Sequence, residues 1–194
     1  LKQIFIINND DCLRAAEGNA AHCYFNAFEE LILNNKKYFT FKTRNRRPPT
    51  DPVNALLSFA YTLLASDCRH ALEVVGLDSY VGFMHKDRPG RASLALDLME
   101  ELRPHFADRF VLSLINRNEL SESDFDMQAS GAMFLSADSR KKFLSAWQNR
   151  KKEEITHPFL KEKIEWGLVP YCQALLLART IRGDLDEYPP FLWK

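Results

Sequence analysis

The chain has 194 residues, and its 26 Lys and Arg residues are balanced by 26 Asp and Glu residues, so the formal net charge is zero. A hydrophobic share of 46% with 14 Phe is enough for a folded core and excludes a largely disordered chain. The length fits one domain, or one domain with a small appendage. The balanced charge neither requires nor excludes a nucleic-acid partner, so only local charge clusters can indicate one.

The sequence shows no secretory signal peptide and no apolar run long enough to span a membrane. Its four cysteines (Cys12, Cys23, Cys68 and Cys172) form no CxxC pair, and each lies in an apolar, helix-like run. We therefore expect a cytoplasmic protein whose thiols are reduced and buried. Because the chain begins at Leu1 without Met, we also expect that an N-terminal portion lies elsewhere.

Apolar residues at steps of three and four predict a first helix over residues 10–34. A basic loop closed by prolines follows, and Thr50 or Asp51 is placed to cap a second helix that begins near Pro52. The apolar face of this second helix predicts that it lies in the core. The glycine- and proline-containing stretch over residues 76–92 is typical of a loop.

A short helix is predicted over residues 93–102, and Pro104 suits the first turn of another helix. Ser136 is placed to cap a further helix. Residues 158–182 again show helical periodicity, with a bend expected near Gly167.

Strand-like alternation is limited to two short segments, "KQIFIINN" and "YFTFK". The sequence therefore predicts an all-α, multi-helix domain over residues 1–183. Residues 184–194 are predicted to form an extended aromatic tail, which could either pack back on the domain or dock on a partner.

A histidine and two acids form the first candidate site. Asp97 and Glu100 lie three residues apart and share a helix face, and the proline and glycine between His85 and Asp97 let the chain turn back. Carboxylates and an imidazole suit Mn²⁺ or Mg²⁺ better than a structural zinc ion. The alternative, which the spacing alone favours, is a solvated acidic helix with Glu101 as a solvated neighbour.

Glu17 raises the same question. It is followed by Gly18 in an otherwise apolar helix, and a glycine there costs about 1 kcal/mol relative to alanine, so a packing or access reason is expected. A partly buried carboxylate needs a cation or a metal as its partner. An ion pair with Arg14, one turn earlier, is the alternative.

Basic residues cluster in two places, over residues 36–47 with interleaved aromatics and over residues 140–152. Such clusters can follow a phosphate backbone, with the aromatics supplying packing or stacking. The alternative for each cluster is a solvated surface.

Four stretches resemble one known family in their order and spacing: "RAAEGNAAHCYF", "RNRRPPTDPVNALLSFAYTLL", "GFMH" followed by "GRASLALDLMEELRP", and "GLVPYCQALLLARTIRGDLDEYPPFLWK". Together they resemble the C-terminal helical domain of the CRISPR-associated spacer-acquisition endonuclease/integrase, the Cas-one family, and within it the subtype I-C branch. The resemblance implies a β-rich N-terminal domain that makes much of the dimer contact, and we expect it to lie outside this sequence.

The resemblance implies a catalytic metal site that holds Mn²⁺ or Mg²⁺ through Glu17, His85 and Glu100. Asp97 matches the other acid position of the motif and would support the site or share the metal. The implied reaction joins the 3′-ends of a short DNA fragment to a CRISPR repeat by transesterification, in antiviral defence. Expected DNA contacts are Arg44, Arg46, Arg47, Lys141 and Lys142.

The resemblance also implies partners: double-stranded DNA, a second small CRISPR adaptation protein, a trimming nuclease of the same system, and a second copy of the full-length protein. No membrane partner is expected. Two alternatives remain open at this point, a non-catalytic helical domain that binds DNA or protein, and a related transposon integrase.

Overall fold

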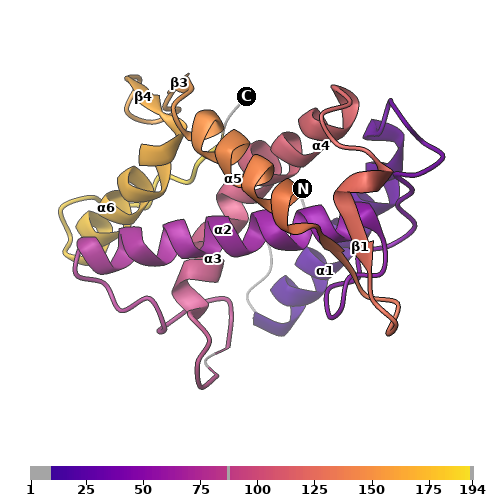
Figure 1. The fold of residues 1–194 in the computed structure, drawn as a ribbon. Coiled ribbons are helices and arrows are strands. Elements are labelled where there is room, and N and C mark those ends of the chain that lie inside the picture. The colour runs from indigo at the N-terminus through magenta and orange to yellow at the C-terminus, as the bar shows by residue number, and fades with distance from the viewer. Residues whose placement is uncertain (1–9, 87, 193–194) are drawn as a thin grey trace.

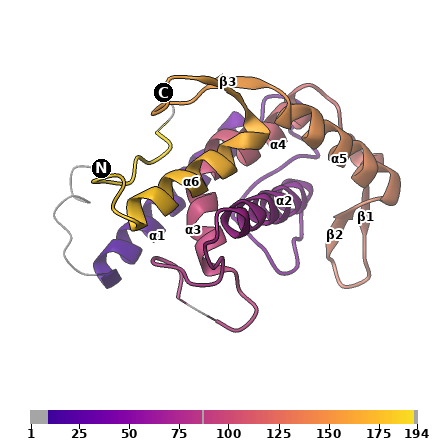
Figure 2. The ribbon, with the colours of Figure 1, turned by 90° about the vertical axis from the view of Figure 1, so that its left-hand side faces the viewer.

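Helix α2 (Pro52–Val74) runs through the middle of the molecule, and the other elements pack around it (Figure 1). The computed structural model describes residues 10–86 and 88–192, and Figure 2 views α2 nearly end-on. The other main elements are α1 (Asp10–Phe28), α3 (Ser93–Leu102), η3 (Arg103–Asp108), α4 (Arg109–Asn116), β1 (Phe125–Met127), β2 (Met133–Leu135), α5 (Ala137–Lys151), β3 (Glu154–Thr156), β4 (Lys163–Glu165) and α6 (Val169–Ile181). Short 3₁₀ turns are η2 (Glu29–Leu31), η4 (Glu122–Asp124) and η5 (Trp166–Leu168).

The start of α2 follows from its sequence. The side chain of Asp51 accepts the backbone N–H of Asn54 at 2.8 Å, and Pro52 occupies the first turn, where no N–H is needed. Asp51 is therefore the cap, one of the two residues that the sequence predicted. The predicted apolar face is buried, with Leu56 and Leu57 fully so, and it contacts α3, α4, α6 and β2.

Helices α3 and α4 are joined by a π-helical turn, η3, so the chain stays helical from Ser93 to Asn116. Pro104 lies in this turn. It has no N–H to donate, and its ring would clash with the carbonyl four residues earlier in a regular α-helix, which accounts for the wider turn. Pro104 thus lies in the first turn of a helical segment, as predicted, but this segment continues α3 without a break.

The all-α prediction is also wrong, because the described chain contains two small antiparallel sheets. Strand β1 pairs with β2 and strand β3 pairs with β4, so the fold is mixed, although mostly helical. Each strand has three residues, which is too short to show alternation in the sequence. The predicted strand "YFTFK" forms turns and irregular chain instead, and "KQIFIINN" lies outside the described residues.

Two predicted helices are shorter than expected. The first ends at Phe28 and continues only as the η2 turn. The helix predicted over residues 158–182 is α6, and it begins only at Val169. Residues 154–165 form the β3–β4 hairpin instead, and Gly167 lies in the η5 turn. Helix α5 begins where predicted, since Ser136 accepts the N–H of Ser139 at 3.3 Å.

The described part of the C-terminal tail, residues 184–192, packs back on the domain. The hydroxyl of Tyr188 donates to Glu101 Oε1 at 2.6 Å, and the N–H of Phe191 donates to Glu101 Oε2 at 2.7 Å. The Phe191 ring is buried against the Trp166 and His157 rings. The prediction that Glu101 is only a solvated neighbour is wrong, because it anchors the tail.

The four cysteines are free thiols, but only Cys68 is buried. Cys12 and Cys23 are exposed on α1 and Cys172 is half-buried, which corrects the expectation of four buried thiols. No helix in the described part of the chain is long and apolar enough to cross a membrane.

Candidate functional site

Asp97 organises the loop that carries His85. Its Oδ2 accepts the backbone N–H groups of Phe83 at 2.8 Å and Met84 at 3.0 Å. Its Oδ1 accepts the backbone N–H of His85 at 3.0 Å and lies 2.6 Å from His85 Nδ1. Both oxygens of this buried carboxylate are thus engaged by the loop. Because a carboxylate accepts, Nδ1 carries the proton and Nε2 is left with the lone pair.

Gly82 allows the loop to approach α3 this closely. A Cβ at this position would lie 2.7 Å from the Ser93 Cβ and 2.9 Å from Asp97 Oδ2, inside van der Waals contact. The glycine therefore permits the loop to lie directly over the first turn of α3. His85 is half-buried as a result, with 23% of its side chain exposed.

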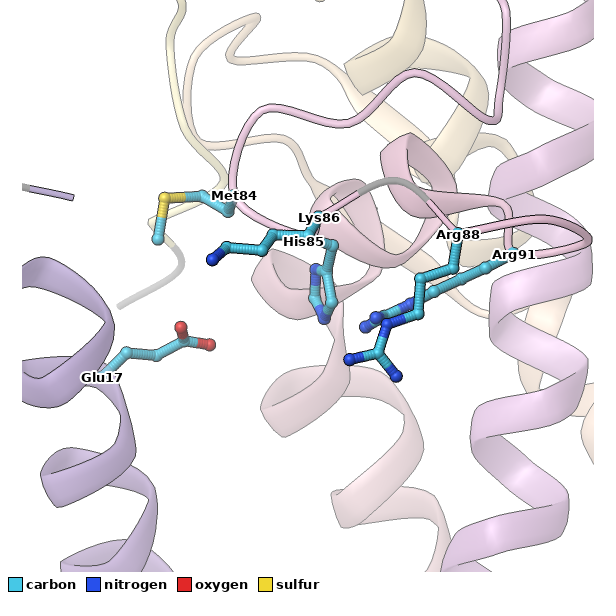
Figure 3. Close-up of a pocket in the computed structure, with 6 residues that line it drawn as sticks. All are labelled: Glu17, Met84, His85, Lys86, Arg88 and Arg91. Atoms are coloured by element: carbon cyan, nitrogen blue, oxygen red, sulfur yellow. The ribbon is translucent and has the colours of Figure 1, made fainter. Parts of the chain in front are cut away.

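A cavity of about 250 Å³ lies between this loop and α1 (Figure 3). Glu17 projects from α1 toward His85 and Lys86, so an acid and an imidazole face each other across it. Basic side chains also line this cavity. The residues that line it are Glu17, Met84, His85, Lys86, Arg88 and Arg91.

Glu100 lies one turn along α3 from Asp97 and is half-buried. Burial raises the pKa of its carboxyl group, and the Glu17 carboxylate raises it further, while Arg103, His85 and Arg46 act in the opposite direction. The Arg103 guanidinium donates to Glu100 Oε1 at 2.8 Å. Glu17, His85 and Glu100 therefore belong to one electrostatic neighbourhood, although they come from three separate segments.

These three side chains are not gathered at ligand distance. Within residues 10–86 and 88–192, no group of three or more His, Cys, Asp or Glu side chains is close enough to hold a metal ion. The chemistry of the donor set nevertheless fits a hard divalent ion, since it offers two carboxylates and one imidazole nitrogen. The alternative pairing of Glu17 with Arg14 involves a side chain outside the described part of the structure.

The structure turns Arg44 inward, away from the role in DNA contact that the sequence suggested. Its guanidinium donates to Asn54 Oδ1 at 2.6 Å and to Ser58 Oγ at 3.0 Å, and it lies 5.2 Å from the centre of the Tyr61 ring. Phe39 and Phe41 of the same segment are buried in the core. These aromatics supply packing, and stacking on bases is not open to them.

The other predicted DNA contacts are exposed, in the loop before α2 and on α5. Arg46 is near enough to the site to act on Glu100, and Arg47 is its exposed neighbour. Lys141 and Lys142 lie on α5, across α2 from α1 (Figure 2). Lys141 also pairs with Asp138 at 3.2 Å.

The predicted site did not include Lys86, Arg88 and Arg91. All three line the cavity with Glu17 and His85. A signal was present, because three cations lie within six residues of the candidate histidine in "HKDRPGR". Their role depends on the turn that folds this loop over α3, which the spacing alone does not show.

The sequence of this chain matches one protein family and several curated proteins of that family. Residues 1–149 match the family model described as CRISPR associated protein Cas1. The chain is 61% identical over 184 residues to "CRISPR-associated endonuclease Cas1 2" of Rhodospirillum rubrum, a match that covers 95% of this chain and 54% of that protein. It is 43% identical over 185 residues to "CRISPR-associated exonuclease Cas4/endonuclease Cas1 fusion" of Geobacter sulfurreducens, covering 94% of this chain and 33% of that protein.

Two solved structures share the fold. "Casposase bound to integration product" superposes with a TM-score of 0.84 at 26% identity, covering 93% of this chain and 50% of that chain. A chain of "Partial Cas6-RT-Cas1--Cas2 complex" superposes with a TM-score of 0.79 at 29% identity, covering 97% of this chain and 55% of that chain. The chain thus spans about half the length of the first relative and of both structures. By its family match and its identity to curated relatives, the chain belongs to the Cas1 family.

Proposed function

We propose that this chain is the catalytic part of a metal-dependent DNA endonuclease/integrase. It would join the 3′-ends of short DNA fragments to a CRISPR repeat by transesterification, as the step that acquires spacers. The names of the curated relatives and the casposase neighbour with its integration product support this proposal. The single observation that carries it is His85, oriented by Asp97, facing Glu17 across a cavity edged by cations.

Glu17, His85 and Glu100 are the proposed ligands for Mn²⁺ or Mg²⁺. When bound, such an ion lowers the pKa of an attacking hydroxyl and stabilises a leaving oxygen. Asp97 is proposed as a positioning residue, because both of its oxygens already accept bonds from the loop. It holds the imidazole with the Nδ1 proton fixed, so that Nε2 is available to a ligand. A carboxylate–imidazole site of this kind needs no Ser or Tyr nucleophile.

The cations at the cavity are proposed to hold the DNA backbone. Lys86, Arg88 and Arg91 line the space, and Arg46 lies close enough to act on Glu100. Placed beside two carboxylates, these cations would offset the repulsion between the acids and a phosphate. Lys141 and Lys142, on the other side of α2, are proposed for a separate and weaker DNA contact.

We also propose partners and a subtype for the full-length protein. The proposed partners are a second copy of the protein, a second small adaptation protein and a trimming nuclease. One structural neighbour is a chain of a complex with Cas2, and one relative is a fusion with Cas4, which supports the last two. The subtype I-C assignment is supported by the resemblance of the C-terminal segment.

A second candidate function is DNA integration outside a CRISPR locus. The casposase, at a TM-score of 0.84, favours it, but its 26% identity is far below the 61% of the CRISPR-associated relative. A choice of target DNA separates the two, because only the CRISPR function requires a repeat as the acceptor.

The test is strand joining by the full-length protein on DNA with and without a CRISPR repeat, in Mn²⁺, Mg²⁺ or EDTA. We expect joined product with a divalent ion, none in EDTA, and none from His85→Ala. The control is His70→Ala, an exposed histidine on α2, which should join normally. Unchanged joining by His85→Ala would remove His85 from the mechanism, and DNA binding without any product would favour a non-catalytic domain.

A further inference from the structure

A fully buried acid, Asp108, lies at the end of the π turn and outside the candidate ligand set. None of its side chain is accessible to solvent. Its Oδ2 accepts the hydroxyl of Tyr24, on α1, at 2.8 Å, and its Oδ1 accepts the hydroxyl of Tyr61, on α2, at 2.5 Å. One carboxylate therefore ties three elements together, which are α1, α2 and η3.

The same cluster reaches Glu100. The Arg103 guanidinium lies 5.3 Å from the centre of the Tyr61 ring and donates to Glu100 Oε1 at 2.8 Å. Arg44 lies on the Tyr61 ring as well, at 5.2 Å. Asp108 is thus linked to Glu100 through Tyr61 and Arg103, by contacts with side chains that are mostly withdrawn from solvent.

The π turn brings Asp108 to this place. In an unbroken α-helix, Asp108 would lie roughly 80° around the axis from Glu100, because each residue turns the helix by ~100°. A π turn takes up about one extra residue and so turns the chain back by ~100°. Asp108 then falls close to the face that carries Glu100 and meets Tyr24 and Tyr61 there.

Helix α1 has little else to hold its site end. Every residue from Glu17 to Cys23 is exposed or half-buried, and burial in the core begins with Phe25. Tyr24 follows Glu17 by seven residues, two helical turns along the same face. The bond from Tyr24 to Asp108 therefore holds α1 to the π turn two helical turns from Glu17.

We infer that Asp108 is a positioning residue that sets the placement of Glu17 relative to Glu100. It clamps α1 to the π turn through Tyr24, and it steadies Glu100 through Tyr61 and Arg103. The catalytic use of this clamp rests on the function proposed above. The chemical consequence is that α1, which carries Glu17, stays on the same side of the domain as Glu100, so that both carboxylates would be available as ligands if a divalent ion bound there.

The test compares Asp108→Asn and Tyr24→Phe with a matched control, Asp124→Asn. Asp124 is also a buried acid that accepts hydroxyl groups, from Ser139 at 2.6 Å and Ser121 at 3.0 Å, but both of these partners lie outside α1. In the full-length protein, the rate of hydrogen exchange at the backbone amides of residues 17–23 measures how firmly α1 is held. This measurement does not depend on catalytic activity. We expect ~tenfold faster exchange in Asp108→Asn and Tyr24→Phe, the effect of one lost hydrogen bond.

Kinetics then separate positioning from stability. We expect Asp108→Asn and Tyr24→Phe to lower kcat for strand joining by about 10–100-fold and to raise the Mn²⁺ concentration for half-maximal rate, with KM for DNA nearly unchanged. Asp124→Asn should lower the melting temperature and leave kcat unaltered. The double variant should be about as impaired as Asp108→Asn alone, because Tyr24→Phe removes a bond that Asp108→Asn already disrupts.

Each outcome decides the inference. Unchanged exchange of residues 17–23 in both variants overturns the clamp, and faster exchange with unchanged kcat overturns its role at the site. Should Asp108→Asn fail to fold, Tyr24→Phe removes only one hydroxyl and carries the test. A wild-type protein that joins no DNA would overturn the proposed function, while faster exchange in the variants would still support the clamp.

Discussion

Asp97 Oδ1 lies 2.6 Å from His85 Nδ1, and it also accepts the backbone N–H of His85 at 3.0 Å. One carboxylate oxygen therefore holds both the ring and the backbone of the residue that faces Glu17. Carboxylate–imidazole pairs of this kind orient histidines that bind metals, because they fix the tautomer and the rotation of the ring. This relationship separates the roles of Asp97 and Glu100, which the spacing of the sequence left open.

Asp97→Asn should weaken metal-dependent joining more than it weakens DNA binding. The amide cannot accept at both ends, so the His85 ring loses its fixed tautomer and one of the loop N–H groups loses its acceptor. We expect joining to fall by about 10–100-fold and the Mn²⁺ requirement to rise. Stability should fall by about 1–3 kcal/mol, read from urea unfolding. The control is Asp126→Asn, an exposed acid of β1; a normal Mn²⁺ requirement in Asp97→Asn would show that Asp97 orients nothing.

Arg44→Ala should destabilise the domain rather than weaken its DNA binding directly. The guanidinium holds Asn54 and Ser58 and lies on the Tyr61 ring, and hydrogen bonds to charged groups contribute more than neutral ones. We expect a loss of about 2 kcal/mol or more in the free energy of unfolding, measured by urea titration. Arg46→Ala, at an exposed position of the same loop, should change stability little. Equal stability of the two variants would contradict the internal role of Arg44.

Arg46→Glu combined with Arg47→Glu should lower DNA affinity, with the largest loss at low salt. Each phosphate contact removed should reduce the slope of log K against log salt by about 0.9 for double-stranded DNA. Binding isotherms at several salt concentrations measure this slope. Lys141→Glu with Lys142→Glu changes the charge equally on α5, outside the cavity lining, and should have a smaller effect. An unaltered slope in the variant with Arg46→Glu and Arg47→Glu would show that this loop makes no contact with DNA phosphates.

Stability should fall in mild acid because of His157. The ring is fully buried, its Nδ1 accepts the N–H groups of Phe159 at 3.3 Å and Leu160 at 3.2 Å, and its Nε2 lies 3.1 Å from Gln173 Oε1. Burial lowers the pKa of His157, with the Gln173 bond opposing the shift. The folded state thus favours the neutral ring, so this contribution is complete above the unfolded pKa of about 6.5 and is lost as pH falls through the lowered value.

His157→Asn measures that contribution. The amide oxygen can accept the same two N–H groups but does not titrate, so the difference in unfolding free energy between wild type and variant should shrink as the pH is lowered from about 7 to about 5. Urea unfolding at each pH gives the difference. The control, His70→Asn at an exposed position of α2, should keep the pH dependence of the wild type. A constant difference across this range would assign the acid sensitivity to other groups.

Local signals predicted much of the helical framework. The cap at Asp51, the helix from Ser93 to Leu102 and the cap at Ser136 depend on residues within one turn of each other, so they can be read along the chain. The strands could not be read in this way. Three residues per strand carry no periodicity, and their partners are set by the hairpins that hold them together.

The directions of polar side chains were the least predictable feature. Arg44 and Arg46 look equivalent in a basic loop, yet one is held inside by Asn54 and the other is exposed. Glu100 and Glu101 are neighbours, yet Glu100 pairs with Arg103 while Glu101 anchors the tail through Tyr188. In both pairs, the direction of each side chain depends on which distant segment packs beside it.

By itself, the sequence determined the helical framework, its caps and the residue types of the candidate site, because those depend on composition and on spacing within a few residues. Only the tertiary structure decided that Asp97 holds His85, that Lys86, Arg88 and Arg91 join the cavity, and that Asp108 links α1 to the π turn. These relationships join residues far apart in the chain, and they arise only when burial of the apolar faces brings α1, the His85 loop and α3 together.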